Sequence, residues 1–178
     1  EFGTEFSLCE QLLSQDQRNF HCWNYRRFIA SYCRRMNELR SSTGYGEKAE
    51  GNAASLSSLG SDSRELDYSL AKIQENFSNY SAFHHRSTFI KENDDVAVIP
   101  QLLTRELAMI ESAIFTEPDD QSAWWYHQFL FNWVIDEIQK NGPGTSASIS
   151  VRWLVSVLFQ QLRIMDKLLE VERDSKWA

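Results

Sequence analysis

Three nine-residue stretches of this chain share one pattern: NFHCWNYRR at residues 19–27, NYSAFHHRS at residues 79–87 and DQSAWWYHQ at residues 120–128. Each stretch opens with Asn or Asp, has a small residue in fourth place and a large aromatic residue in fifth place, and has Arg or His in eighth place. Self-similarity at a spacing of tens of residues is typical of stacked structural repeats. The pattern therefore predicts an array of repeated units.

Apolar residues precede each stretch at intervals of three and four residues, which places them on one face of a helix. The nine-residue stretch would then begin a second helix after a tight turn. The sequence thus predicts an all-α fold built from antiparallel helical hairpins. The expected apolar stripes are Leu8, Leu12 and Leu13; Leu66, Leu70 and Ile73; and Leu102, Leu103, Leu107, Ile110 and Ile114.

Each place in the repeat has an expected structural role. The first residue would cap the second helix with a side-chain oxygen, and the fourth would let the neighbouring helix approach. The fifth would fill the groove between the paired helices, with the eighth on nearly the same face. In that order, the residues are Asn19, Asn79 and Asp120; Cys22, Ala82 and Ala123; Trp23, Phe83 and Trp124; and Arg26, Arg86 and His127, where His127 is expected to replace Arg structurally.

The organisation of the chain around these repeats can also be predicted. Residues 1–6 resemble translated cloning sites and are set aside, and residues 7–178 are expected to form one helical repeat domain with a flexible Ser/Gly-rich insertion at 41–62. Residues 149–171 are predicted to form the first helix of a fourth hairpin. Because the chain lacks an initiator Met and stops in a polar, helix-like run, we expect a fragment of a longer protein. The expected stripe of the last helix is Leu154, Leu158, Leu162, Met165, Leu168 and Leu169.

Composition and charge exclude several classes of function. The net charge is −7 and basic residues form no run, which argues against binding to nucleic acid. The longest apolar stretch, residues 151–158, contains Arg152 and is far shorter than the roughly 20 residues that cross a bilayer. Three cysteines without a CxxC pair indicate free thiols in a reducing compartment, so we expect a cytoplasmic protein.

The histidines and cysteines give little support to a catalytic or metal site. His84 and His85 are adjacent and would point about 100° apart on a helix, which is poor geometry for shared metal ligation. The sequence has no GxSxG, P-loop, GxGxxG or HExxH motif, and Cys22 has no role beyond its place in the repeat. The acidic run at 117–120 is typical of a helix start. We therefore predict no metal site and no autonomous catalytic residue in this chain.

The three stretches resemble the repeat of protein prenyltransferase α subunits, whose signature is Asn-x-x-Ala/Cys-Trp-x-x-Arg on helical hairpins of irregular spacing. The longer stretches at 16–28, 76–87 and 115–127 are most similar to the Rab geranylgeranyltransferase branch of that family. The similarity covers most of residues 7–178 outside the insertion. It implies a right-handed, TPR-like α-α superhelix. Phe83 departs from the family pattern by replacing Trp.

This resemblance implies a scaffold for a catalytic β subunit that holds zinc and the isoprenoid, so no cofactor is expected in this chain. The heterodimer would transfer geranylgeranyl from its diphosphate to C-terminal cysteines of Rab GTPases that an escort protein delivers. In related enzymes the turn that matches Asn19, Phe20 and His21 reaches toward the active site of the β subunit. His21 is thus a possible active-site neighbour, and Phe20 lacks a phenol oxygen. The expected partner-binding residues are Phe20, His21, Asn79, Tyr80, His84, Gln121 and Trp125.

Two other classes of function remain open at this point. A TPR-like adaptor that binds peptides without an enzyme partner would explain the hairpins equally well, although tetratricopeptides keep a steadier 34-residue period. A stand-alone hydrolase that uses His and Cys is the third interpretation. Because a truncated array leaves apolar faces uncovered, the fragment is also expected to self-associate or to be marginally stable.

Overall fold

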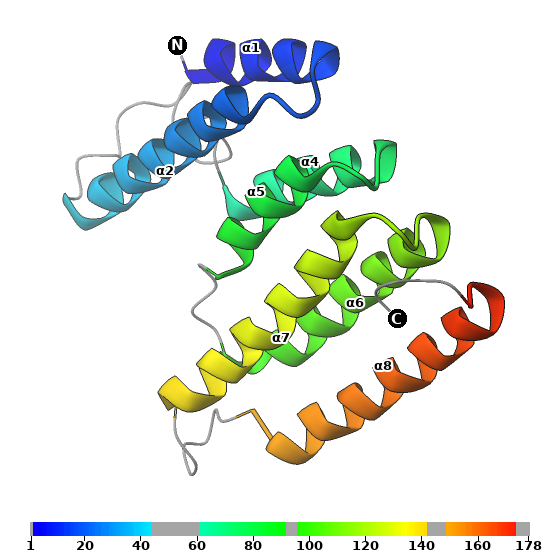
Figure 1. Cartoon of the computed structure of the whole chain (residues 1–178). Coiled ribbons are helices and arrows are strands. Elements are labelled where there is room, and N and C mark those ends of the chain that lie inside the picture. Colours follow the sequence, from blue (N-terminus) through cyan, green and yellow to red (C-terminus); the bar gives the residue numbers. More distant parts are fainter. Residues whose placement is uncertain (1, 44–60, 92–95, 142–148, 174–178) are drawn as a thin grey trace. The chain divides into compact units, whose positions relative to one another are not determined.

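The computed structural model describes residues 2–43, 61–91, 96–141 and 149–173, which are helical apart from short turns. No strand occurs in these ranges, so the predicted all-α fold is confirmed (Figure 1). The helices are α1 (Phe2–Gln15), α2 (Phe20–Thr43), α4 (Asp62–Glu75), α5 (Tyr80–Lys91), the 3-10 turn η1 (Val96–Val98), α6 (Ile99–Thr116), α7 (Gln121–Asn141) and α8 (Val151–Val171).

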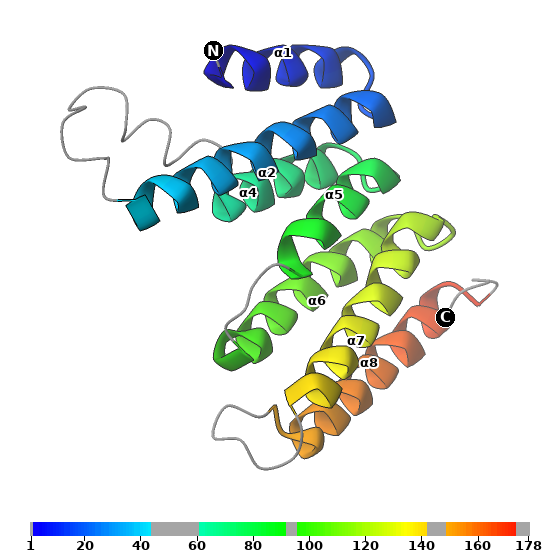
Figure 2. The same cartoon turned by 90° about the vertical axis from the view of Figure 1, so that its left-hand side faces the viewer.

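The chain divides into two compact units, Glu1–Ile90 and Lys91–Ala178. The first unit contains the hairpins α1–α2 and α4–α5, and the second contains the hairpin α6–α7 followed by α8 (Figure 2). Each unit has its own buried apolar side chains, among them Phe6, Trp23 and Phe83 in the first and Ile110 and Leu130 in the second. The handedness of the whole array stays a prediction.

The capping residues act as predicted in all three repeats. The Oδ1 atoms of Asn19 and Asn79 accept hydrogen bonds from the backbone N–H groups of Cys22 and Ala82, at 3.0 and 3.1 Å. Asp120 Oδ1 accepts from the backbone N–H of Ser122, two residues further on, at 2.8 Å. Each cap satisfies a backbone donor that the first turn of a helix leaves unpaired, which stabilises a helix by about 1 kcal/mol. The second helix of each hairpin therefore begins directly after its Asn or Asp.

The small and aromatic residues also take their expected places, with one addition. Cys22, Ala82 and Ala123 are buried, Trp23 and Phe83 are at most 1% exposed, and Trp124 is half-buried. In addition, the indole N–H of Trp23 donates to the Gln17 carbonyl at 2.9 Å, and that of Trp124 donates to the Pro118 carbonyl at 2.8 Å. The tryptophan thus closes the turn between the helices as well as filling the groove, a role that Phe83 cannot share because it has no donor.

The start of the chain takes part in the fold, although the sequence analysis set residues 1–6 aside. Helix α1 begins at Phe2, and the Phe6 side chain is completely buried. The apolar stripe of this helix also differs from the expected one: Leu8 and Leu12 are exposed, and the residues that pack inward with Leu13 are Phe6 and Cys9. The prediction was wrong because it left out Phe6, which sets the buried face of the helix.

Two further boundaries need correction. Helix α2 continues to Thr43, and Ser61 caps α4 by accepting from the Arg64 backbone N–H, so both ends of the expected insertion at 41–62 belong to helices. Residues 44–60 lie outside the described ranges. In α8 the expected stripe is only partly right, because Leu158 and Leu162 are exposed and Gln161 and Ile164 are buried instead, with Leu154 and Leu168 as predicted. None of the helices in the described part of the chain has the length and hydropathy to cross a membrane.

Candidate partner-binding edge and its polar supports

A carboxylate on the first helix of each hairpin binds an aromatic side chain on the second helix. Glu5 Oε2 accepts from the Tyr25 hydroxyl at 2.9 Å, and Glu106 Oε2 accepts from the Tyr126 hydroxyl at 3.0 Å. In the middle hairpin Glu65 Oε2 accepts from His85 Nε2 at 2.8 Å. The two partners are 20 residues apart in every case. This link is a repeat feature that the sequence analysis missed, although the regular placement of Glu was visible in the sequence.

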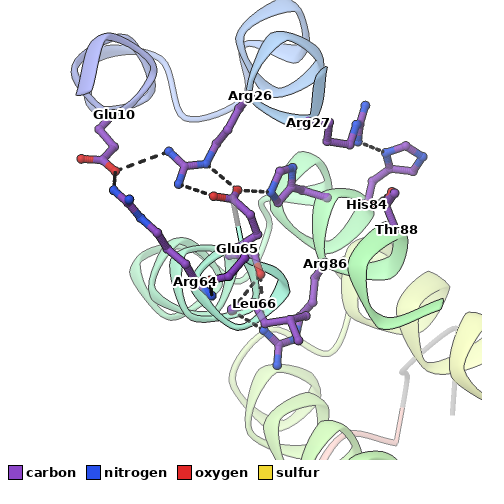
Figure 3. Close-up of polar contacts among 12 residues, drawn as sticks. Glu10, Arg26, Arg27, Arg64, Glu65, Leu66, His84, Arg86 and Thr88 are labelled. Carbon is purple, nitrogen blue, oxygen red and sulfur yellow. Dashed lines mark hydrogen bonds and ion pairs between the residues drawn. The ribbon is translucent and has the colours of Figure 1, made fainter. Parts of the chain in front are cut away.

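In the first unit this link is part of a buried charged cluster. Glu65 receives two hydrogen bonds from the Arg26 guanidinium, from Nε at 2.7 Å and from Nη2 at 2.8 Å. Arg26 also lies 3.4 Å from Glu10 on α1, and its guanidinium carbon is 3.6 Å from the ring centroid of Tyr68. Figure 3 shows Arg26 between Glu10 and Glu65, so that it joins the first hairpin to the second. A bidentate pair with an aromatic face fits the planar guanidinium better than it would fit a lysine.

The protonation states of this cluster follow from its surroundings. Burial alone would raise the pKa of Glu65, but the hydrogen bonds from His85 and Arg26 and the charge of Arg26 hold it below its usual value. Burial lowers the pKa of His85 and outweighs the carboxylate beside it. The buried part of the cluster therefore carries the carboxylate of Glu65, the guanidinium of Arg26 and a neutral imidazole whose Nε2 holds the proton. His85 Nδ1 has no hydrogen-bond partner among the described residues, which agrees with an unprotonated nitrogen.

In the third repeat the eighth residue, His127, contacts the next helix, α8, through uncharged groups. His127 Nε2 donates to Gln161 Oε1 at 3.1 Å. Gln161 and Glu65 lie the same number of residues before the C-caps of α8 and α4, so they occupy equivalent places in their helices. An amide therefore replaces the carboxylate at the contact where His127 replaces Arg. Burial lowers the pKa of His127, against the effect of its bond to Gln161. The expectation that His127 substitutes structurally for Arg is consistent with this contact.

Arg86, in the eighth place of the middle repeat, binds within its own hairpin. Its Nη1 donates to the backbone carbonyl of Leu66 and to Ser69 Oγ, the latter at 3.3 Å, and the side chain is buried. Figure 3 shows it pointing to the helix that carries Leu66. The eighth residue of the repeat therefore serves helix packing in all three repeats, and none of the three is placed for binding a partner.

Some of the expected partner-binding residues lie together on an exposed edge of the first unit. Phe20 is 60% exposed and Tyr80 is 46% exposed, at the first positions of α2 and α5. His21 is exposed, and its ring lies 4.0 Å from that of Phe20. Between the two helix starts is a hollow of about 250 Å³, lined by Phe20 and Tyr80 and also by His84. We call this surface the Phe20–Tyr80 edge.

Arg27 is the cation in this hollow, and the sequence analysis did not single it out. Its Nη1 donates to His84 Nδ1 at 2.7 Å (Figure 3), and its Nη2 donates to Asn24 Oδ1. Burial lowers the pKa of Arg27, and burial together with the charge of Arg27 lowers the pKa of His84. The hollow therefore combines a half-buried guanidinium with a neutral imidazole between two exposed aromatic rings.

Asn79 does not belong to this exposed edge. Its side chain is completely buried, because Oδ1 caps α5 and Nδ2 donates to the Gln17 carbonyl at 3.1 Å. The same turn receives a hydrogen bond from Arg18 Nη2, which donates to the Ser78 carbonyl at 2.9 Å. The structure thus places Asn79 at the contact between two turns of the first unit, not on the surface where a partner could reach it.

The remaining two expected residues belong to the second unit. Gln121 is the exposed first residue of α7, and Trp125 lies one turn later, half-buried. The Trp125 ring stacks on Phe129, with centroids 5.9 Å apart, and lines a hollow of about 210 Å³. Lys91 Nζ lies 5.1 Å from the Phe129 ring centroid in the same region. Each unit thus has an aromatic and cationic surface near the second helix of a hairpin.

The described residues contain no constellation that suggests catalysis. Within them, no group of three or more His, Cys, Asp or Glu side chains could hold a metal ion. Cys9, Cys22 and Cys33 are free and buried. Burial raises the pKa of Cys9 to about 12 and also raises those of Cys22 and Cys33, so these thiols are protonated and weak nucleophiles at neutral pH. The arrangement offers surfaces for binding and buried polar groups for stability.

The fold and these junctions define a helical-repeat protein made of hairpins with an Asx-capped turn, an aromatic wedge and a polar contact to the neighbouring helix. Residues 2–33, 62–92 and 103–134 match the family described as "Protein prenyltransferase alpha subunit repeat". The chain belongs to the protein prenyltransferase α subunit family, as the sequence resemblance predicted.

Curated relatives carry one name across distant organisms, geranylgeranyl transferase type-2 subunit alpha. The Schizosaccharomyces pombe protein is 32% identical over 183 residues, which cover 98% of this chain and 46% of that protein. The mouse protein is 35% identical over 72% of this chain and 20% of its own length, and the Saccharomyces cerevisiae protein is 32% identical over 69% and 32%. This chain therefore spans less than half the length of these relatives.

Proposed function

We propose that this chain is part of the α subunit of a Rab-type protein geranylgeranyltransferase and that it scaffolds a catalytic β subunit. The observation that carries the proposal is the family repeat, present three times, together with a relative named as a type-2 α subunit that aligns with nearly the whole chain. The Phe20–Tyr80 edge supports it, because exposed aromatic and Arg side chains are enriched at protein interfaces.

In this proposal the chemistry takes place in the β subunit. The β subunit holds the zinc and the isoprenoid, and the heterodimer transfers geranylgeranyl to C-terminal cysteines of a Rab GTPase presented by an escort protein. In this proposal the chain contributes no catalytic residue and no cofactor, and His21 is a neighbour of the active site in the β subunit. The compartment is the cytoplasm, which agrees with three free cysteines.

Co-expression with a type-2 geranylgeranyl transferase β subunit tests this proposal. We expect this chain to be retained by an affinity tag on the β subunit and to elute with it as one heterodimer in size exclusion. A farnesyltransferase β subunit serves as the control and should retain less. A monodisperse chain that never elutes with the type-2 β subunit would contradict the proposal. Recovery of peptides bound by the chain alone would favour the TPR-like adaptor, which the family match does not favour.

Exposed apolar side chains on α8 support the additional proposal that the isolated chain self-associates. Val151, Phe159 and Leu162 are each about 60% exposed. Sedimentation velocity at increasing protein concentration should show a rising mass. A monomer that keeps its mass at high concentration and melts cooperatively at high temperature would contradict it.

A further inference from the structure

We infer that the hollow at the Phe20–Tyr80 edge is a receptor site for one acidic side chain of the β subunit, with Arg27 as its anchor. This inference rests on the proposed function, because it assigns the β subunit as the partner of this edge. Three observations carry it: the charge of Arg27 in the hollow, the volume of the hollow, and the exposed aromatic rings at its rim.

The charge of Arg27 is not balanced within the described residues. Both of its hydrogen-bond acceptors, Asn24 Oδ1 and the Nδ1 of His84, are neutral. The neighbouring residue, Arg26, differs in that it pairs with two carboxylates, those of Glu65 and Glu10. A half-buried guanidinium that lacks a carboxylate bears a desolvation cost that a bound anion would offset.

The helix ends around the hollow add to its positive potential. The hollow lies at the starts of α2 and α5, where the backbone dipoles leave a partial positive charge. Neither helix has an acidic residue in its first turn to neutralise that charge. An anion in the hollow would therefore interact favourably with the guanidinium and with both helix starts.

The features of the hollow favour a carboxylate from a protein over a free phosphate. One first-turn N–H group of each helix, at Cys22 and at Ala82, is already bound by the side chain of Asn19 or Asn79, which leaves fewer donors to cradle a phosphate. The volume of about 250 Å³ accommodates one side chain and lies below the usual range for small-molecule sites. The rim consists of two exposed aromatic rings, Phe20 and Tyr80, which is the composition of a protein-binding hot spot with Arg at its centre.

The experiment measures the affinity of the chain for a type-2 β subunit by biolayer interferometry. The variants Arg27→Gln and Arg27→Glu remove or reverse the anchoring charge. Arg35→Gln and Arg35→Glu on the exposed surface of the same helix are the matched controls. We expect Arg27→Gln to weaken binding by at least about tenfold and Arg27→Glu to weaken it more, while both Arg35 variants stay within about threefold of the wild type.

A second variant tests the hollow without removing Arg27. Ser81 lines the hollow, so Ser81→Glu places a carboxylate inside it and should occupy Arg27 within the chain. We expect weaker binding to the β subunit with an unchanged circular dichroism spectrum and a melting temperature no lower than that of the wild type, because the new carboxylate lies beside Arg27 and in the first turn of α5. Binding by Arg27→Gln or Ser81→Glu that equals the wild type would overturn the inference.

Two further outcomes separate the sources of failure. If the wild-type chain does not bind the β subunit, the proposed function fails and this inference fails with it. If the wild type binds and the Arg27 variants bind equally well, only the inference fails. Inorganic phosphate is added to the free chain in tenfold steps of concentration, and the total tryptophan fluorescence, to which Trp23 at the hollow contributes, is recorded. A saturable response that Arg27→Gln abolishes, together with competition against the β subunit, would assign the site to phosphate instead.

Discussion

In the first unit Arg26 meets the carboxylate of Glu65, whereas in the second unit His127 meets the amide of Gln161 at the corresponding place of the repeat. The charged junction is completely buried, and its carboxylate accepts three hydrogen bonds from Arg26 and His85. At the neutral junction the imidazole of His127 and the amide of Gln161 share a hydrogen bond of 3.1 Å. The comparison teaches that the repeat requires matched hydrogen-bonding partners at this place, not a particular charge.

The largest effect is expected from breaking the charged junction on one side. Glu65→Ala leaves the Arg26 guanidinium buried without its bidentate carboxylate and leaves the His85 N–H without an acceptor. Removing one partner of a buried pair costs about 3–5 kcal/mol, so the free energy of unfolding should fall by that amount. Urea denaturation followed by circular dichroism measures it. Glu38→Ala on the exposed surface of α2 is the control, and an equal loss in both variants would contradict the role of the cluster.

The second effect comes from placing a charge in the neutral junction. His127→Arg puts a guanidinium against the amide of Gln161, which satisfies a hydrogen bond but does not neutralise the charge. We expect a loss of about 2 kcal/mol in the free energy of unfolding. Adding Gln161→Glu should recover most of it, because the second unit would then hold the same pair as Arg26 and Glu65. A double-mutant cycle measures the recovery as a coupling energy, and additive effects would show that the two places are independent.

Lowering the pH should reduce the stability of both junctions. Burial lowers the pKa of His85 and of His127, so the unfolded chain binds protons at these residues more readily than the folded one. Their contribution to stability is therefore present above the unfolded His pKa of about 6.5 and is lost as the pH falls below it. The lowered pKa of Glu65 acts likewise, with stability lost at more acidic pH, below the unfolded Glu pKa of about 4.3.

Chemical denaturation between pH 7.5 and pH 4 measures this dependence. His85→Gln and His127→Gln should each flatten the part of the profile near pH 6, and the double variant should flatten it most. A wild-type profile that rises from pH 7 to pH 5 would contradict the sign of both pKa shifts.

The parts of the molecule that the sequence predicted are those with local causes. An Asn or Asp cap, a small residue and an aromatic residue act within one helical turn, so Asn19, Ala82 and Trp124 could be placed from the spacing alone. The polar junctions depend on which residue of one helix faces a residue of the next, and a single-helix pattern does not contain that information. Arg26 and Glu65 are 39 residues apart, and their contact follows only from how the hairpins pack.

In the candidate site, too, some features have local causes in the sequence and others depend on how the hairpins pack. Phe20 and Tyr80 were expected to bind a partner because the family resemblance implies that this side of the repeats faces a β subunit, and both side chains are exposed. Asn79 was expected beside them, but it is buried because a second turn, at Gln17, packs against it. Arg27 was not predicted as a site residue because the repeat pattern places its cation in the eighth place, at Arg26, and assigns no role to the ninth. The Glu5 to Tyr25 bond was overlooked because the first six residues were set aside.

The smallest effect is expected from the indole hydrogen bonds, which differ between repeats. Trp124→Phe removes the bond from Nε1 to the Pro118 carbonyl and keeps most of the ring volume, so it imitates the middle repeat, where Phe83 packs without such a donor. A neutral hydrogen bond contributes about 1 kcal/mol, and the half-buried carbonyl can turn to water, so the loss should not exceed that value. Phe83→Trp is the reciprocal variant; it should not gain stability, because its site is completely buried and the larger indole would overpack it. Equal and opposite changes in the two variants would show instead that the indole bond alone separates these repeats.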